Sequence, residues 1–214
     1  MSGGGDARLH APATLRNREP LAGGLDGLLG RGAAGGPAPV LLEVAAGSGE
    51  HAAFFAARYP AWEWWPSDPS AEARASIAAW TAGLPNVRPP LALDAAAGPF
   101  PTGPLDAVLC VNMAHIAPWA ATEGLVRGAG AALRAGAPLV LYGPWLRAGV
   151  ETAASNLAFD AALRARDGRW GLRSLDALAA VGAAAGFGPP AVTELPANNV
   201  AVVLRAGAQP SSSR

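Results

Sequence analysis

The sequence has no lysine and only one cysteine among its 214 residues. Its sixteen basic residues are all arginine, and sixteen acidic residues balance them to a formal net charge of zero. A single cysteine excludes an internal disulfide and any metal site built from several thiolates, so we expect no metal centre. The neutral net charge gives no general attraction to nucleic acid or to an anionic membrane, although it does not exclude a local cluster of basic residues.

Long apolar runs are also missing. No stretch of about eighteen uninterrupted apolar residues is present that would span a bilayer. Residues 1–13 lack the apolar core of a signal peptide, but Arg8 and His10 lie in a segment low in acids, which leaves an organellar transit peptide open. The default expectation is therefore a soluble, intracellular protein of the cytoplasm.

What the chain does have is apolar material for one large core. Hydrophobic residues make up 51% of the chain and charged residues 15%, which favours one large folded domain. The segments 1–14 and 207–214 show no apolar periodicity and are predicted to be flexible tails, which leaves a domain over residues 15–206. A short helix is predicted within 23–39.

Short apolar runs alternate with helical patterns from Val40 onward. Strands that alternate with helices favour a mainly parallel sheet covered on both faces. The last two strands, 191–195 and 200–205, are joined by a link of hairpin length, so one edge strand should be antiparallel. The pattern predicts a Rossmann-like α/β fold with a seven-stranded sheet whose third strand covers 91–94.

A glycine-containing loop follows the first predicted strand. It reads Glu43-Val44-Ala45-Ala46-Gly47-Ser48-Gly49, and glycines at such a turn let the backbone approach a ligand. Asp68 closes the second predicted strand, where a carboxylate can accept from ribose hydroxyls, and Asp94 closes the third, a position suited to an adenine amino group. The competing interpretation is that both aspartates cap the helices that follow.

Two cofactors fit this loop. Residues 47–52 satisfy the dinucleotide fingerprint G-x-G-x-x-[G/A], so an NAD-dependent oxidoreductase is an alternative. A carboxylate at Glu43 would be a poor neighbour for a pyrophosphate, whereas it could accept from the ammonium of a methionine moiety through water. The absence of lysine removes the Tyr/Lys chemistry of many NAD enzymes. The E-x-A-x-G-x-G form is similar to the signature of S-adenosylmethionine-dependent methyltransferases, and we favour that cofactor, with Ala45, Gly47 and Gly49 among its binding residues.

Longer motifs point to one family. They occur in order along most of the chain, and they include Leu15-Arg16-Asn17-Arg18-Glu19-Pro20, Trp64-Trp65-Pro66-Ser67-Asp68, Val111-Asn112-Met113-Ala114-His115 and Leu195-Pro196-Ala197-Asn198-Asn199. Together they resemble the domain-of-unknown-function 938 family, the methyltransferase-like protein 26 group. The resemblance implies a class I methyltransferase fold and S-adenosylmethionine binding, but no substrate.

Candidate catalytic residues follow the fourth and fifth predicted strands. Asn112 begins the segment Asn112-Met113-Ala114-His115, at a place where such enzymes have substrate and cofactor contacts. This segment differs from the Asn-Pro-Pro-Tyr pattern, which binds amino groups. His115 is the leading candidate for a general base because histidine titrates near neutrality. The alternative is a structural histidine bonded to the backbone. Tyr142 ends the fifth strand and could reach the same cleft, and Trp119 and Trp145 could form a wall of an acceptor pocket.

Three residues outside these strands complete the candidate cofactor site. His51, in the first turn of the helix after the loop, could donate to the cofactor or support the local structure. Arg16 and Asn17 could fold over the cofactor as a lid, or belong to an ordinary helix start. The favoured function is methyl transfer to an unidentified small-molecule or protein acceptor. The alternative of a catalytically silent, cofactor-binding scaffold stays open.

Overall fold

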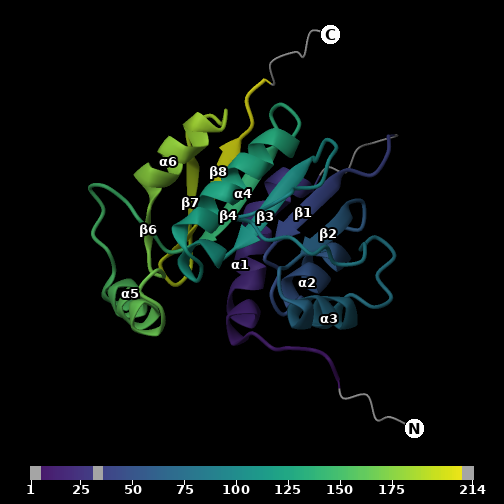
Figure 1. Cartoon of the computed structure of the whole chain (residues 1–214), viewed down its shortest axis with the longest axis horizontal. Coiled ribbons are helices and arrows are strands. Elements are labelled where there is room, and N and C mark those ends of the chain that lie inside the picture. Colours follow the sequence, from purple (N-terminus) through teal and green to yellow (C-terminus); the bar gives the residue numbers. More distant parts are fainter. Residues whose placement is uncertain (1–5, 31–35, 209–214) are drawn as a thin grey trace. The chain divides into compact units, whose positions relative to one another are not determined.

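The chain divides after Asp94 into two compact units. The computed structural model describes residues 6–30 and 36–208 (Figure 1). Residues 1–5 and 209–214, which belong to the two predicted tails, lie outside the described residues, as does part of the segment 23–39. None of the described helices is long and apolar enough to cross a membrane.

The first unit is built on a pair of parallel strands. Its elements in chain order are α1 (Pro12–Leu29), β1 (Val40–Val44), α2 (Glu50–Arg58), β2 (Glu63–Ser67) and α3 (Ala71–Trp80). In the parallel register Leu41 lies beside Trp64 and Val44 beside Ser67, so the two strands end together. Helices α2 and α3 pack side by side (Figure 1).

Burial of large side chains holds this unit together. Trp64 and Phe55 are fully buried, and their rings stack with centroids 6.0 Å apart. Helix α1 buries Leu21, Leu25 and Leu29, which are spaced four residues apart on one face. This apolar stripe stabilises α1 as a helix although it contains Pro20.

The N-terminal end of α1 lies earlier than the predicted domain boundary. The boundary at Leu15 falls inside α1, and the residues before it are hydrogen-bonded to the first unit. Leu9 N donates to Ser76 Oγ at 2.8 Å, and Ala11 N donates to Glu50 Oε2 at 2.7 Å. The segment 9–11 is therefore fastened to α2 and α3.

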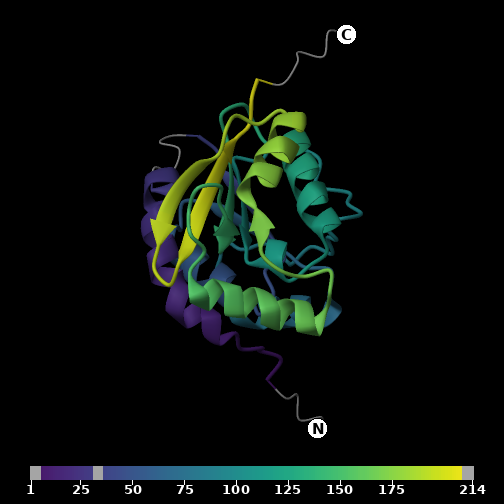
Figure 2. The same cartoon turned by 90° about the vertical axis from the view of Figure 1, so that its left-hand side faces the viewer.

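The second unit carries four strands in the order β3, β4, β8, β7. Its elements in chain order are β3 (Ala107–Val111), the 3₁₀ helix η1 (Met113–His115), α4 (Trp119–Ala132), β4 (Pro138–Gly143), β5 (Trp145–Leu146), α5 (Ala154–Arg166), β6 (Arg173–Ser174), α6 (Leu175–Ala184), β7 (Ala191–Leu195) and β8 (Asn199–Arg205). β3 and β4 are parallel, and β8 is antiparallel to both β4 and β7. The predicted antiparallel hairpin is thus confirmed. Helices α4 and α6 lie side by side on one face of these strands (Figures 1 and 2).

The predicted strand number is wrong by one. The described residues contain six sheet strands, two in the first unit and four in the second, together with the short parallel pair β5–β6. The predicted third strand, 91–94, is reduced to a single bridge between Leu91 and Ser67. Pro89 and Pro90 come directly before it, and because proline has no N–H to donate, they interrupt the pairing with β2 between Arg88 and Leu91. The α/β class with mainly parallel strands is confirmed.

The glycine loop gives a matched pair of stability tests. A Cβ on Gly49, whose φ is +87°, would lie 2.6 Å from Ile77 Cα. Gly47 has φ +57° but open space around its added Cβ. We expect Gly49→Ala to lower the free energy of unfolding by about 3 kcal/mol, through both strain and overlap. Gly47→Ala should cost about 1 kcal/mol, from strain alone. Urea unfolding measures both, and equal losses would contradict the packing described for Gly49.

Candidate functional site

The predicted glycine loop connects β1 to the N-terminus of α2. Three of its residues have left-handed backbone conformations, with φ of +56° at Ala45, +57° at Gly47 and +87° at Gly49. The loop therefore turns sharply within a few residues. A side chain on Gly47 would meet no heavy atom within 4 Å, so this part of the backbone is open to a close ligand.

Asp68 lies directly after β2 and is hydrogen-bonded to the loop. Its Oδ2 accepts from Gly47 N at 3.1 Å, and its Oδ1 accepts from Ser70 N at 2.9 Å. Each carboxylate oxygen has about two acceptor positions, so each retains capacity for a ligand hydroxyl. The cap of α3 is Ser70, whose Oγ accepts from Ala73 N, and not Asp68. The Asp68 carboxylate therefore does not cap α3, which was the competing interpretation of the sequence.

Asp94 follows the chain segment that bridges to the end of β2. Leu91 N donates to Pro66 O at 2.9 Å, and Asp68 N donates to Leu91 O at 3.1 Å. This pairing brings the segment beside Asp68. Asp94 itself is exposed, and its contact with an adenine stays a prediction.

Glu43 is buried within β1. It is 1% exposed, and its Oε2 accepts from Trp64 Nε1 at 2.7 Å. Burial raises the pKa of the Glu43 carboxyl to about 7, and the hydrogen bond from Trp64 opposes that rise. The sequence did not reveal this partner, because the contact depends on the register of β1 against β2. A water-mediated contact of Glu43 with a cofactor stays a prediction.

His51 and Asn17 are bonded to each other. His51 Nε2 lies 2.7 Å from Asn17 Oδ1, and both side chains are buried. Burial lowers the pKa of His51 to about 4, with the Glu50 carboxylate opposing the shift and the Arg18 charge adding to it. This pair ties α1 to α2, which supports the structural interpretation of His51. Arg16 is exposed on α1, and its role as a lid residue stays a prediction.

Glu50 organises the loop and was not a candidate from the sequence. This buried carboxylate at the start of α2 accepts from Ser48 Oγ at 3.0 Å and from Ala11 N at 2.7 Å. Ser76 Oγ in turn donates to Ser48 O at 2.6 Å. An acidic residue in the first helical turn is an available signal for such a role. The glycine loop is thus held from the side of α3 and from the N-terminal segment.

In the second unit, Asn112 and His115 frame a tight turn after β3. Asn112 adopts a left-handed conformation with φ +63°, and its backbone N donates to Tyr142 O at 2.9 Å. His115 N donates to Asn112 O at 3.1 Å, which closes the turn. Tyr142 lies near the end of β4 and is 4% exposed. The structure therefore brings Asn112, His115 and the Tyr142 backbone together at the ends of β3 and β4.

The His115 side chain is enclosed. It is 1% exposed, and its ring lies edge-on to Trp145 with centroids 5.2 Å apart. In the described part of the chain, neither ring nitrogen has a hydrogen-bond partner. A Cβ on Gly143, whose φ is +151°, would lie 2.4 Å from His115 Nε2, so only glycine leaves room for this ring.

The charge state of His115 follows from its surroundings. Burial, with a smaller contribution from the positive charge of Arg173, lowers its pKa to about 4. The backbone of Gly171 and the Asp160 carboxylate oppose the shift. The imidazole is therefore neutral at physiological pH, as a proton acceptor must be, but it is a weaker base than an exposed histidine.

The segment after α5 covers this histidine. Gly171 N donates to His115 O at 2.9 Å, and Arg173 donates to Ala114 O at 2.9 Å and to Ala117 O at 2.7 Å. Arg173 was not a candidate from the sequence, because these acceptors are backbone carbonyls more than fifty residues away. The 3₁₀ helix η1, through Ala114, and the segment after it, through Ala117, are thereby fastened to the start of β6.

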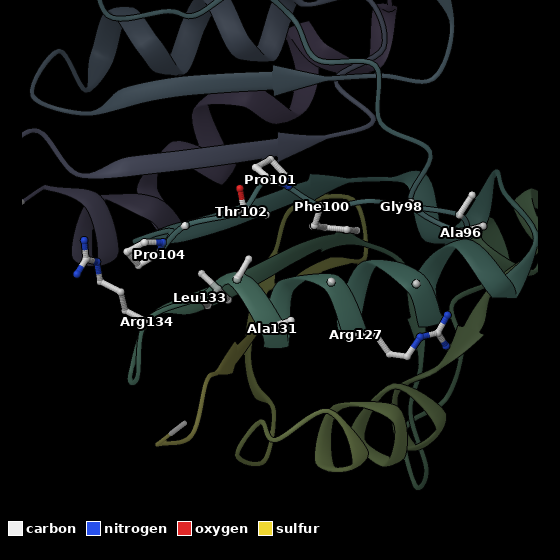
Figure 3. A pocket seen from close by; sticks show the side chains of 16 residues that line it. Ala96, Gly98, Phe100, Pro101, Thr102, Pro104, Arg127, Ala131, Leu133 and Arg134 are labelled. Atoms are coloured by element: carbon white, nitrogen blue, oxygen red, sulfur yellow. The ribbon is translucent and has the colours of Figure 1, made fainter. Parts of the chain in front are cut away.

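A separate cavity of about 800 Å³ lies in the second unit and contains none of the predicted site residues. It runs between the segment 95–104 and one face of α4 (Figure 3). Figure 3 shows Arg127 and Ala96 toward one end, and Arg134 and Pro104 toward the other. Phe100 is the aromatic side chain among its lining residues.

The fold is that of methyltransferases. Human N-acetylserotonin methyltransferase, in a complex with S-adenosylmethionine, aligns with 91% of this chain at a TM-score of 0.74 and 13% identity, over 53% of its own length. An O-methyltransferase family protein from Burkholderia thailandensis aligns with 92% at a TM-score of 0.71 and 17% identity, over 58% of its length. Mitomycin 7-O-methyltransferase aligns with 91% at 0.71 and 16% identity, over 54% of its length. The chain spans little more than half the length of these structures.

The family is shown by a match over nearly the whole chain. Residues 8–206 fit the model described as a protein of unknown function, DUF938, and the chain belongs to this family. The resemblance found in the sequence is confirmed, both for the family and for the methyltransferase class of fold.

Glu43 generates a pH-dependent prediction. Because its pKa rises from 4.5 to about 7 on folding, its contribution to stability is full below pH 4.5 and is lost as the pH rises through 7. Glu43→Gln keeps an acceptor for Trp64 without a buried charge. We expect this variant to gain roughly 3 kcal/mol relative to the native protein between pH 5 and pH 8.

Chemical unfolding at several pH values measures this difference. Glu72→Gln, at an exposed position of α3, is the control and should show no comparable trend. A stability difference that stays constant from pH 5 to pH 8 would show that Glu43 does not titrate in this range.

Proposed function

We propose that this protein is an S-adenosylmethionine-dependent methyltransferase that acts on a small-molecule or protein acceptor. The observation that carries the proposal is the contact between the open glycine loop and Asp68. Gly47 leaves the backbone free on one side, and the carboxylate that binds its N–H keeps acceptor capacity on both oxygens. These features fit a nucleoside whose ribose hydroxyls bind to Asp68.

The structural likeness supports the same cofactor. The human N-acetylserotonin methyltransferase structure holds S-adenosylmethionine, and another similar structure, PigF, holds S-adenosylhomocysteine. When bound, S-adenosylmethionine supplies a methyl group whose bond to sulfur breaks while the electron pair stays on the sulfur. In our proposal Gly47, Gly49 and Asp68 hold this cofactor, and Ala45, Glu43 and Asp94 complete the predicted set.

The second unit supplies a residue that can hold the acceptor's proton. The side chain of His115 is neutral at physiological pH and buried from water, and its ring nitrogens have no hydrogen-bond partner among the described residues. A neutral imidazole in this state can accept a proton from a nucleophile. Burial keeps bulk water away from that nitrogen, so the residue serves as a base only for a group that enters its enclosure. Asn112 and Tyr142 position this residue through the backbone contacts of the turn.

Cofactor binding tests the proposal directly. Isothermal titration with S-adenosylhomocysteine should show micromolar affinity for the native protein, and NAD should show none. Asp68→Ala removes two charge-assisted acceptors for ribose hydroxyls, so we expect its affinity to fall by about tenfold to a hundredfold. Glu72→Ala, which removes an exposed acid from the neighbouring helix, should bind normally.

Circular dichroism of each variant separates loss of binding from loss of fold. A folded Asp68→Ala variant that binds S-adenosylhomocysteine as tightly as the native protein would overturn the assignment of this site. Binding of NAD in place of S-adenosylhomocysteine would favour the oxidoreductase alternative.

A further inference from the structure

The segment 8–11, which comes directly before α1, lies against α2 and α3 through hydrogen bonds. Leu9 N donates to Ser76 Oγ at 2.8 Å, and Ala11 N donates to Glu50 Oε2 at 2.7 Å. The first three residues of the segment are exposed. Hydrogen bonds, rather than deep burial, therefore hold the segment in place.

Both acceptors of this segment also hold the glycine loop. Ser76 Oγ donates to Ser48 O at 2.6 Å, and Glu50 Oε2 accepts from Ser48 Oγ at 3.0 Å. Ser48 lies between the two glycines of the loop. One hydroxyl and one carboxylate oxygen thus connect segment 8–11 to the middle of the loop.

The two shared side chains are buried, and their burial couples the two sets of hydrogen bonds. Ser76 is 0% exposed and Glu50 is 7% exposed. A hydroxyl that accepts a hydrogen bond becomes a stronger donor, so the bond from Leu9 N strengthens the bond from Ser76 to Ser48. Ala11 N supplies a donor to a buried carboxylate, where the loss of a donor is costly. Docking of the segment therefore favours the conformation in which Ser48 is bonded.

The loop needs such restraint because its glycines allow several conformations. The angle φ is +57° at Gly47 and +87° at Gly49, and glycine adopts either sign of φ about equally well. Gly47 N donates to Asp68 Oδ2 at 3.1 Å, and the proposed cofactor site rests on this contact. A restrained Ser48 between the glycines keeps that N–H directed at the carboxylate.

We propose that segment 8–11 positions the glycine loop for the cofactor, and that docking of the segment and binding of the cofactor strengthen each other. The backbone N–H groups of Leu9 and Ala11 act through the two shared side chains, so these are positioning residues and need no contact with the cofactor. The inference rests on the proposed function, because it requires the cofactor to bind at this loop. Since such a coupling is reciprocal, the bound cofactor also stabilises the docked segment.

Two double variants of the full chain test this coupling. Leu9→Pro with Ala11→Pro, the proline variant, removes both N–H donors of the segment, because proline has none. Leu9→Ala with Ala11→Gly keeps both N–H groups and is the matched control. Neither changes a residue of the loop, of α2 or of α3. The bond from Trp80 Nε1 to Leu9 O does not use these N–H groups, so the variants differ only in the links that the segment shares with the loop.

Hydrogen exchange of the loop tests the coupling without any ligand. Gly49 N donates to Ala46 O at 3.0 Å, so its exchange reports on opening of the loop. In ¹⁵N-labelled protein we expect the Gly49 amide to exchange about fivefold to tenfold faster in the proline variant, and at the native rate in the control. Leu42, a buried residue of β1, reports on global unfolding. Equal acceleration at Gly49 and Leu42 would overturn the inference, because the segment would then contribute to stability alone.

Cofactor binding tests both directions of the coupling. Isothermal titration with S-adenosylhomocysteine should show an affinity about fivefold to tenfold weaker for the proline variant than for the native protein, and an unchanged affinity for the control. In the native protein, saturation with S-adenosylhomocysteine should slow the exchange of the Leu9 and Ala11 amides by a similar factor. A purely structural role of the segment would not produce this second effect, because the segment would then not respond to the ligand.

The outcomes separate the two proposals. If S-adenosylhomocysteine does not bind the native protein, the proposed function fails, and the exchange of the Gly49 amide alone decides whether the segment positions the loop. If it binds the native protein, the proline variant and the control with equal affinity, the coupling is refuted while the proposed function stands. Unchanged exchange of the Gly49 amide in the proline variant would refute the positioning role as well.

Discussion

The hydrogen bond from the Gly47 backbone N–H to the Asp68 carboxylate joins the glycine loop to the end of β2. Because β1 and β2 are parallel and end in register at Val44 and Ser67, the loop and the aspartate emerge side by side. The loop needs left-handed conformations to turn there, and the packing of Gly49 against Ile77 permits no side chain. In our proposal, the placement of the cofactor on this unit depends on that one link, since it fixes both the open backbone and the carboxylate.

Burial sets the chemistry of the titratable groups in both units. It raises the pKa of Glu43 and lowers those of His51 and His115, in each case because the charged form loses its hydration. The consequences differ with the partners. The side chains of Glu43 and His51 are hydrogen-bonded to Trp64 and Asn17 within the first unit. The ring nitrogens of His115 have no such bond among the described residues, and in our proposal this residue acts as the base.

Much of the fold was predictable because it depends on local pattern. The strand at 40–44, the loop after it and the hairpin at the end of the chain follow from short apolar runs and turn residues. Helix α1 was only partly predicted, because Pro20 and the glycines at 23 and 24 lower its helix propensity, whereas the burial of Leu21, Leu25 and Leu29 stabilises it. The strand expected at 91–94 is reduced to one bridge, and Pro89 and Pro90 before it interrupt the pairing of this segment with β2.

The candidate site was predictable only in its residues, not in their partners. Glycine and aspartate at strand ends signal a ligand loop, but the bond of Glu43 to Trp64 depends on strand register. Trp145 and Gly143 pack against His115. Gly171 and Arg173 donate to the backbone of His115 and Ala114. These contacts join segments that are far apart in the sequence. No periodicity encodes such contacts.

A crystal structure of the protein with S-adenosylhomocysteine tests the central claim most directly. The account predicts that the ribose hydroxyls bind to the Asp68 carboxylate and that the ligand lies against the open side of Gly47. S-adenosylhomocysteine bound elsewhere, with Asp68 in contact only with the protein, would contradict it.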